Sequence, residues 1–438
     1  MQKIKFQHHI FGLAVNCLLI CLAAAILSGC NSRKKNVLKV NKPILYNPAS
    51  TSLHPNIGVF HLSETESQMF ISLNTNELIV NEANEERVPK AEVKIHYELY
   101  DCTETENNKI VTDSATFFNI LQIKKTQKSV VFPITFPAVQ GRRYMLSVQM
   151  TDVFRRNTIR KFITVNKTNE FSGQNFRVIA LNGSPKLDNM INENEIFRII
   201  YQRRPVDSIF IKYMAAPGAI ATSPLSSASA EALKFKADSV WVQAYSPTTN
   251  FMFGYEGLYL IQTDTMRQDG LLLMNFGAAF PKENRTAKLV EPISYLVNNS
   301  EYQKLTEAGN PKKMMDNFWL AATGSTDKAR MLIRVFYTRM GYANQYFTDV
   351  KEGWKTDRGV VYMVYGLPNN VLKSSDSETW EYTREHQNNS VTFTFDRKDS
   401  PYSDDHFVLR RGDPQTTYWA RAIDSWRKGR VFSLSEID

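Results

Sequence analysis

Cysteine and histidine are scarce in this chain of 438 residues, with 4 cysteines and 7 histidines. Three of the cysteines, Cys17, Cys21 and Cys30, lie in the N-terminal segment, which leaves Cys102 alone in the rest of the chain. If the segment before Cys30 is removed and Cys30 carries lipid, an intrachain disulfide is excluded. Cys102 follows an alternating strand pattern, so we interpret it as a strand-end residue and not as a nucleophile.

The sequence also lacks the motifs of common enzyme chemistry. It has no His-Glu-x-x-His zinc helix, no Gly-x-Ser-x-Gly elbow, no Gly-x-x-x-x-Gly-Lys-Ser/Thr phosphate loop and no paired-cysteine metal motif. The histidines beyond the N-terminal segment are dispersed along the chain: His54, His61, His96, His386 and His406. The sequence therefore predicts no catalytic residue, no metal site and no cofactor.

The N-terminal segment has the pattern of a bacterial lipoprotein signal. Lys3 and Lys5 form a basic start, an apolar run covers 10–27, and Leu27-Ser28-Gly29-Cys30 ends it. Small residues before a cysteine are typical of a signal-peptidase site. We predict a signal peptide over 1–29, with Cys30 as the lipidated, palmitate-bearing first residue of the mature chain. The alternative is a permanent transmembrane helix, because the apolar run is nearly long enough to span a bilayer.

Residues 30–49 are polar with scattered aliphatic side chains, which predicts a tether between the membrane and the first domain. The net charge is +9, and part of the excess comes from Arg33-Lys34-Lys35 in this tether. Cations beside an acyl anchor can lie against anionic headgroups, each adding about 1 kcal/mol. Nucleic acid is a poor alternative partner, because the lipid would hold the chain outside the cytoplasm and no compact basic-aromatic motif occurs.

The residues after Cys30 also bear on the membrane face. Surface-exported lipoproteins of Bacteroidetes-like bacteria tend to carry acidic residues soon after the cysteine, whereas this chain has Asn31-Ser32-Arg33-Lys34. If the source is such a bacterium, we expect an outer-membrane lipoprotein that faces the periplasm.

Two β-rich domains are predicted after the tether. Alternation is clearest in Val93–Leu99, which puts Val93, Ile95, Tyr97 and Leu99 on one face. Short strands without helices indicate an antiparallel β-sandwich over 50–166. Its predicted strands are Phe70–Leu73, Glu77–Val80, Glu92–Tyr100, Val130–Phe136, Tyr144–Met150 and Ile159–Val165.

The second β-rich domain is predicted over 172–297, after the polar linker 166–170. The small residues of 215–232 predict a loop inside it, because Pro217-Gly218 and Ser223-Pro224 break regular structure. Its predicted strands are Phe176–Ile179, Glu195–Tyr201, Ser208–Tyr213, Ser239–Gln243 and Gly257–Thr263.

The last part, 298–438, is predicted to be an α+β domain with a helical segment followed by a small sheet, which makes the whole chain multidomain and mainly β. A helix covers 301–308, Asn310 can cap a second with Pro311 at its first position, and Thr326 can cap a third. Apolar residues then recur at helical spacing as a core stripe: Leu332, Val335, Phe336, Met340, Ala343 and Phe347. Predicted strands follow at Val360–Tyr365, Thr379–Thr383, Val391–Phe395 and Phe407–Arg410. A final helix over Thr417–Lys428 would dock through Trp419 and Trp426.

One segment resembles a known family. Gly353-Trp354-Lys355-Thr356-Asp357, followed by Tyr362 and the Tyr365-Gly366-Leu367-Pro368 turn, is similar to the GWxTD domain of bacterial envelope proteins. Thr379-Trp380-Glu381-Tyr382 resembles the aromatic strand that follows in that family. The resemblance covers roughly 300–430. It implies a β-rich lipoprotein of the cell envelope and no established catalytic activity.

The motif has two physical interpretations. In the structural one, Gly353 and Gly359 supply backbone angles closed to other residues, Thr356 and Asp357 bond nearby N–H groups, and Trp354 fills a gap between helix and sheet. In the functional one, Trp354, Asp357 and Arg358, with Tyr362 nearby, form a recognition patch for a peptide or sugar. The motif alone does not decide between them.

The leading hypothesis is a non-enzymatic, lipid-anchored binding or scaffold module with an envelope protein or polymer as partner. The alternative is an envelope hydrolase acting on glycan or peptide. Carboxylates that could serve as its acid and base are Asp404-Asp405 near His406, Glu381 with Glu385, and Asp357. Arg411-Gly412-Asp413 is interpreted as a turn without an adhesion role.

Overall fold

The structure is a computed structural model of the chain. It describes residues 45–50, 52–81, 89–103, 110–123, 126–215, 220–226, 235–307, 309–383 and 390–432. The predicted signal peptide, Cys30 and most of the predicted tether lie outside these residues. None of the described helices is long and apolar enough to cross a membrane.

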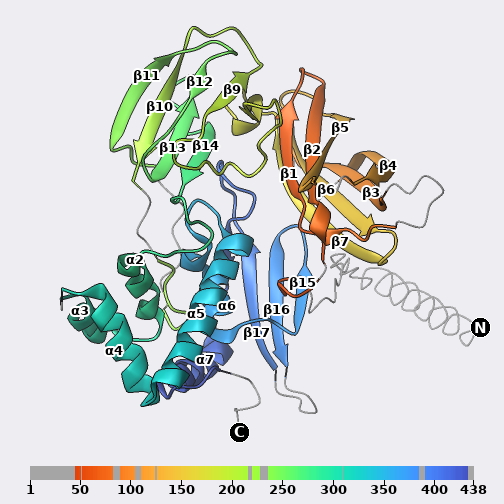
Figure 1. The fold of residues 1–438 in the computed structure, drawn as a ribbon. Helices are drawn as coiled ribbons and strands as arrows, with labels where there is room; N and C mark the ends of the chain where they lie inside the picture. The colour runs from red at the N-terminus through yellow and green to blue at the C-terminus, as the bar shows by residue number, and fades with distance from the viewer. Residues whose placement is uncertain are drawn as a thin grey trace, which may run out of the picture. The chain divides into compact units, whose positions relative to one another are not determined.

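The first domain is a sandwich of two antiparallel sheets that share one core (Figure 1). In β3, Ala91, Val93, Ile95, Tyr97 and Leu99 are all buried, which confirms the predicted alternation. The first sheet has the order β1-β2-β5, from β1 (Asn56–His61), β2 (Glu66–Asn74) and β5 (Ser129–Pro137). The second has the order β4-β3-β6-β7, from β3 (Lys90–Asp101), β4 (Ile110–Gln122), β6 (Arg143–Asp152) and β7 (Asn157–Asn166).

Three parts of this domain differ from the prediction, the first being β1 (Asn56–His61), which was not predicted. Glu77–Val80 is not a strand: Asn74 accepts a hydrogen bond from the N–H of Asn76 and starts the 3₁₀ turn η1 (Thr75–Glu77). Asparagine favours such turns because its side chain bonds the backbone two residues on. Strand β4 was not predicted. Phe118 and Ile120 are exposed on its outer face, so apolar residues lie on both faces and the alternation is blurred.

The second set of strands also forms two antiparallel sheets around a common core. One has the order β12-β9-β8, from β8 (Phe176–Ala180), β9 (Phe197–Tyr201) and β12 (Asn250–Phe251). The other has the order β11-β10-β13-β14, from β10 (Ser208–Met214), β11 (Ser239–Ala244), β13 (Gly257–Gln262) and β14 (Leu271–Asn275). Much of the predicted loop at 215–232 lies outside the described residues.

Helices follow as predicted from 301 onward, whereas α2 (Thr286–Val290) and η3 (Glu291–Tyr295) lie within the predicted second β-rich domain and were not predicted. Asn310 accepts a hydrogen bond from the N–H of Lys313 at the start of its helix, which confirms the predicted cap. The predicted cap at Thr326 is one residue off, because Ser325 occupies the cap position. The elements are α2 (Thr286–Val290), η3 (Glu291–Tyr295), α3 (Asn299–Glu307), α4 (Pro311–Thr323) and α5 (Thr326–Phe347).

The predicted core stripe of α5 is buried at Leu332, Phe336, Met340, Ala343 and Phe347. It packs with the inward side chains of a four-stranded antiparallel sheet, beside which the helices lie in Figure 1. The sheet has the order β15-β16-β17-β18, from β15 (Asn370–Lys373), β16 (Ser377–Thr383), β17 (Ser390–Arg397) and β18 (Phe407–Leu409). Helix α7 (Asp413–Arg427) closes this core with Trp419 and Trp426, both buried.

Val360–Tyr365 is a helix and not the predicted strand. It belongs to α6 (Asp357–Tyr365), in which all nine residues are buried. Complete burial removes the polar positions that reveal a helical period, so a short run of valines and tyrosines is typical of a buried strand as well. The side chain of Thr356, which accepts a hydrogen bond from the N–H of Gly359, selects the helix.

The end of the predicted tether joins this C-terminal core. Tyr46 is 5% exposed and packs with the buried rings of Phe347 and Trp380. Leu289, Tyr295 and Leu296 pack against the same core, which therefore begins in sequence before residue 298.

Candidate functional site

The glycines of the Gly-Trp-x-Thr-Asp motif allow two backbone segments to touch. Gly353 begins the 3₁₀ turn η4 (Gly353–Lys355), and a Cβ there would lie 2.0 Å from the carbonyl oxygen of Ala343. A Cβ on Gly359 would lie 1.9 Å from the carbonyl oxygen of Gly353. Neither glycine is among the residues with positive φ. The prediction that they supply special backbone angles is therefore wrong, and close packing requires them instead.

Trp354 fills the space that these contacts enclose. Its side chain is 1% exposed and meets the ring of Tyr295 edge to face at 5.9 Å. Its backbone N–H donates to Oδ1 of Asn344 at 3.1 Å, and its carbonyl accepts from the Tyr295 hydroxyl at 3.1 Å. The residue therefore ties η4 to α5 and η3.

Thr356 and Asp357 both hold the start of α6. The Thr356 hydroxyl donates to the Gly353 carbonyl at 2.7 Å and accepts from the N–H of Gly359 at 3.1 Å. Asp357 accepts from the N–H of Leu409 at 2.7 Å and from the guanidinium of Arg411 at 3.2 Å. A carboxylate in the first turn suits the helix dipole. Both oxygens of Asp357 are thus engaged within the fold.

Arg358 lies in a buried ion pair with Glu378, whose side chains are 2% and 1% exposed. The guanidinium is 3.4 Å from Glu378 and donates to the carbonyl of Asp405 at 2.9 Å. Its Cζ atom lies 4.2 Å from the centre of the Phe407 ring, close enough for a cation–π contact. The guanidinium is therefore enclosed on several sides.

Three further donors lie against the Glu378 carboxylate, one from β15, one from β16 and one from the segment before β1. Lys373 is 3.2 Å away, the Tyr46 hydroxyl donates at 2.5 Å, and Nε1 of Trp380 donates at 2.7 Å. Burial alone would raise the pKa of Glu378, but Lys373, Arg358 and these hydrogen bonds outweigh it and lower the pKa below its usual value. Glu378 is therefore held as a buried carboxylate.

Tyr362 completes the cluster. Its hydroxyl donates to the carbonyl of Tyr46 at 3.0 Å, and its ring packs against Phe347. All five candidate residues of the motif are buried, with Thr356 the most exposed at 6%. Their burial and internal hydrogen bonds favour the structural interpretation of the motif over the recognition patch.

The carboxylates considered for acid–base chemistry have separate partners. Asp404 pairs with Arg397 and accepts from the N–H of Thr164 at 3.0 Å. Asp405 lies 3.7 Å from Arg358, while His406 contacts Asp349 at 2.6 Å. The proposed group around His406 is thus divided among three different contacts.

The other predicted pair, Glu381 with Glu385, cannot be assessed as a pair. Glu381 accepts from the side chain of Asn370 at 3.2 Å. Glu385 lies outside the described residues.

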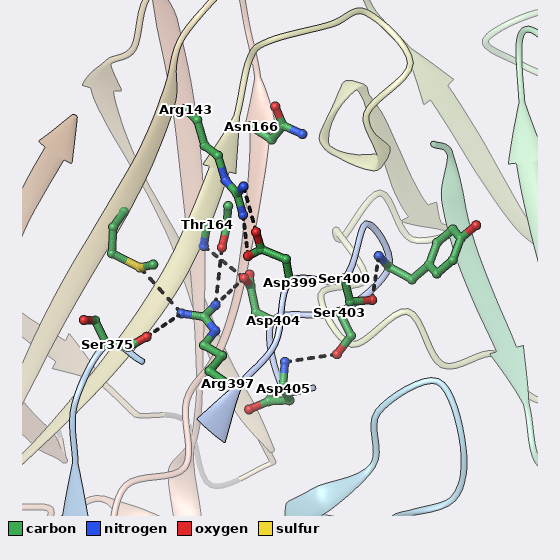
Figure 2. A network of polar contacts seen from close by, with 12 residues as sticks. Arg143, Thr164, Asn166, Ser375, Arg397, Asp399, Ser400, Ser403, Asp404 and Asp405 are labelled. Atoms are coloured by element: carbon green, nitrogen blue, oxygen red, sulfur yellow. Dashed lines mark hydrogen bonds and ion pairs between the residues drawn. The ribbon is translucent and has the colours of Figure 1, made fainter. Parts of the chain in front are cut away.

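Figure 2 shows how the segment 397–405 contacts the first domain. Arg143 of β6 makes two hydrogen bonds with Asp399, at 3.0 and 2.6 Å. Arg397 also reaches the hydroxyl of Thr164 at 3.4 Å. These contacts, with the Asp404–Thr164 bond, join strands β6 and β7 to the C-terminal sheet; we call them the junction.

A cleft of about 1120 Å³ runs beside the junction. Its walls carry charges of both signs, among them Lys161, Arg358 and Lys373 together with Asp188, Asp404 and Asp405. Desolvation raises the pKa of Asp404 although Arg397 opposes it. For Asp405, desolvation is outweighed by Arg358 and Lys161, so its pKa is lowered.

The described histidines serve internal contacts. His61 is buried between the Ser67 hydroxyl and the Asn166 carbonyl, both at 2.9 Å, and desolvation lowers its pKa to about 4. Among the described residues, no group of three or more His, Cys, Asp or Glu side chains is arranged to hold a metal ion.

A comparison with family models adds one finding. The model of the GWxTD domain matches residues 257–428. The chain carries a GWxTD domain. No curated protein matches the chain. The match begins at β13, so it includes β13 and β14 of the second sandwich and is longer than the segment of roughly 300–430 that the motif indicated.

Several residues of this site were not predicted, above all Tyr46, Lys161, Lys373 and Glu378. Glu378 left a signal in the sequence, because it is in phase with Trp380 and Tyr382 on the buried face of β16. An acid in that register predicts a buried partner. Tyr46 and Lys161 left none, since their partners are more than 200 residues away in the chain.

Proposed function

We propose that the protein is a lipid-anchored cell-envelope lipoprotein whose GWxTD domain acts as a non-catalytic binding or scaffold module. The anchor would be Cys30, and the protein would face the periplasm from the outer membrane. The Leu-Ser-Gly-Cys pattern and the basic residues around it support this part of the proposal. The partner would be an envelope protein or polymer.

One observation carries the non-catalytic assignment: the charged groups of Asp357 and Arg358 are used within the fold. Asp357 is bound by Leu409 and Arg411, and Arg358 by Glu378 and the Asp405 carbonyl. A catalytic acid or base must reach its substrate. Residues this deeply buried suit a rigid scaffold that presents other surfaces.

The anchor can be tested by labelling cells with a palmitate analogue and separating their membranes. Cys30→Ser should lose the label and leave the membrane fraction, whereas the matched variant Cys102→Ser should keep both. A Cys30→Ser protein that stays labelled would refute the anchor.

The binding role can be tested by crosslinking the lipidated protein in its native envelope. We expect a specific partner to be recovered with the wild type and lost with a chain that lacks 300–438. Because this truncation removes most of the C-terminal core, the remaining β-sandwiches must be shown to stay folded, by circular dichroism, before the loss is assigned to the GWxTD domain. If the wild type captures no partner, the binding proposal fails.

A hydrolase acting on glycan or peptide is the second candidate. It is favoured by the cleft, where the pKa of Asp404 is raised and that of Asp405 lowered, as acid and base roles require. Asp405→Asn should then abolish turnover of envelope glycan or peptide without lowering the melting temperature. Absence of turnover by the wild type on both substrate classes would exclude this candidate.

A further inference from the structure

Strand β11 lies at the edge of its sheet and exposes apolar side chains (Figure 1). Its sequence, Ser-Val-Trp-Val-Gln-Ala, has no charged residue and no proline. Val240 and Val242 are 52% and 60% exposed. Native edge strands are commonly protected from pairing by charges or proline, as in β5 of the first sandwich, which carries Pro133 and Pro137. Strand β11 has neither kind of protection.

The register shows which main-chain groups of β11 face the open edge. The N–H of Tyr245 donates to the carbonyl of Asp207 at 2.9 Å, one place beyond the end of the β10–β11 register. Hydrogen-bonded and non-bonded pairs alternate along an antiparallel ladder. The N–H and C=O groups of Val240, Val242 and Ala244 therefore point away from β10.

The described part of the chain leaves this edge largely open. Among the described strands, β11 pairs only with β10. The main-chain groups of Val240 and Val242 that point outward have no partner among the described residues. The side chain of Gln243 donates to the Ala244 carbonyl at 3.4 Å, a long hydrogen bond that a neighbouring strand can replace. The edge can thus accept a further strand.

A second copy of β11 fits this edge. The outward-facing groups are centred on Val242, so an antiparallel copy related by a two-fold axis beside Val242 places each Val240 opposite Ala244 of the second copy. In this register the outward N–H and C=O groups of both strands form hydrogen bonds with each other. The same surface serves both copies, as a two-fold interface requires.

The central row of side chains in this register is apolar throughout. Phe210 of β10 pairs across the sheet with Val242. The row that crosses the two-fold axis would therefore contain Phe210 and Val242 of one copy, followed by Val242 and Phe210 of the other. Cross-strand pairs of aromatic and β-branched residues stabilise a sheet. The exposed face of Val242 would gain a neighbour of the same kind.

The two flanking rows bring no like charges together. Lys212 of β10 pairs with Val240, and Ser208 pairs with Ala244. Each flanking row would therefore hold Lys212 and Val240 of one copy beside Ala244 and Ser208 of the other. The Lys212 ammonium already donates to the Thr265 carbonyl at 2.9 Å. The surface around β11 is thus compatible with itself in charge as well as in hydrogen bonding.

We propose that two copies of this chain associate through β11, whose edges pair antiparallel about Val242 and join two β11-β10-β13-β14 sheets into one. A strand of another protein can add to an open edge, but the apolar row at the axis and the matched flanking rows favour a second copy. The inference goes beyond the proposed function and depends on neither the anchor nor the envelope partner. Because one strand pair buries less than a standard interface of about 1,600 Å², the dimer should be weak.

The test is sedimentation velocity on the full-length protein, in a non-ionic detergent so that the apolar N-terminal segment does not itself cause association. The wild type should change from monomer to dimer as its concentration rises through roughly 1–100 µM. Val242→Lys would place two ammonium groups opposite each other at the axis, and it should weaken the dimer about tenfold or more. Val242→Glu should have the same effect.

Mixing the two variants separates pairing from misfolding. An equimolar mixture of Val242→Lys and Val242→Glu should dimerise again, because lysine and glutamate then meet at the axis. Each variant alone should keep the wild-type circular dichroism spectrum, since Val242 is largely exposed. The matched control is Val139→Lys, at a valine that is 47% exposed outside β11, and it should dimerise like the wild type.

Three results would overturn the inference. The first is a wild type that stays monomeric over the whole concentration range. The second is a dimer that Val242→Lys does not weaken, which would assign association to another surface, such as the N-terminal segment. The third is a mixture of the two charged variants that stays monomeric, because the two-fold register about Val242 would then be wrong.

Discussion

Two ion-pair networks lie close together in this chain and differ in exposure. In the Arg358–Glu378 pair, the side chains are 2% and 1% exposed. In the Arg143–Asp399 pair of the junction, they are 39% and 70% exposed. Water screens the second pair and not the first. The comparison teaches that the same chemistry fixes a buried core of the GWxTD domain in one place and makes a solvent-screened contact between β6 and the segment 397–405 in the other.

The largest loss of unfolding free energy is expected at Gly359, where a neighbouring backbone leaves no space for a side chain. In Gly359→Ala, the added Cβ would lie 1.9 Å from the Gly353 oxygen, so α6 and η4 would have to separate. We expect a loss of at least about 3 kcal/mol, measured by chemical denaturation. Gly412→Ala is the control, because nothing lies within 4 Å of its Cβ and its φ of −175° is open to any residue. Equal stability of the two variants would contradict the packing role.

Breaking the buried pair should have the next largest effect. Arg358→Met leaves Glu378 as a buried carboxylate with one cation fewer, which should cost about 3–5 kcal/mol in unfolding free energy. The control is Arg330→Met, which removes a pair whose side chains are 73% and 92% exposed, and it should change little. A similar small change in both variants would remove the distinction between the two networks.

Lowering the pH should reduce the stability that the Arg358–Glu378 network contributes. The pKa of Glu378 is lower in the fold than its usual value of 4.5. Its contribution is therefore fully present above about pH 4.5 and is lost as the pH falls through the lower, folded-state pKa. Wild type should exceed Glu378→Gln in unfolding free energy at pH 7, and the gap should narrow below pH 4.5. A gap that does not change with pH would argue against a buried carboxylate.

These networks also mark the limit of prediction from sequence. The alternation of Val93–Leu99 was sufficient to predict β3, and the spacing of the α5 stripe was sufficient to predict α5. Each element has one buried and one exposed face. Helix α6 was missed because it has no exposed face. The burial of Trp354 and Arg358, and their partners, depend on contacts between distant segments, such as Tyr46 with Glu378, which no local pattern reveals.

The smallest loss of unfolding free energy is expected at the junction. Asp399→Asn removes an exposed pair and should cost at most about 1 kcal/mol, an effect that vanishes in 1 M salt. The measurement is the melting temperature at low and high salt. A larger loss that persists in high salt would show that the junction behaves like the buried network.

The most direct test of the central claim is to measure the melting temperature and the crosslinked partner of Trp354→Phe together. Trp354 is 1% exposed, so the account predicts a loss of about 1–3 kcal/mol in unfolding free energy. The melting temperature should fall accordingly, and the partner should still be captured. Trp241→Phe, at a tryptophan that is 36% exposed, is the matched control and should leave the melting temperature nearly unchanged. An unchanged melting temperature with loss of the partner in Trp354→Phe would contradict the account and return the motif to a recognition role.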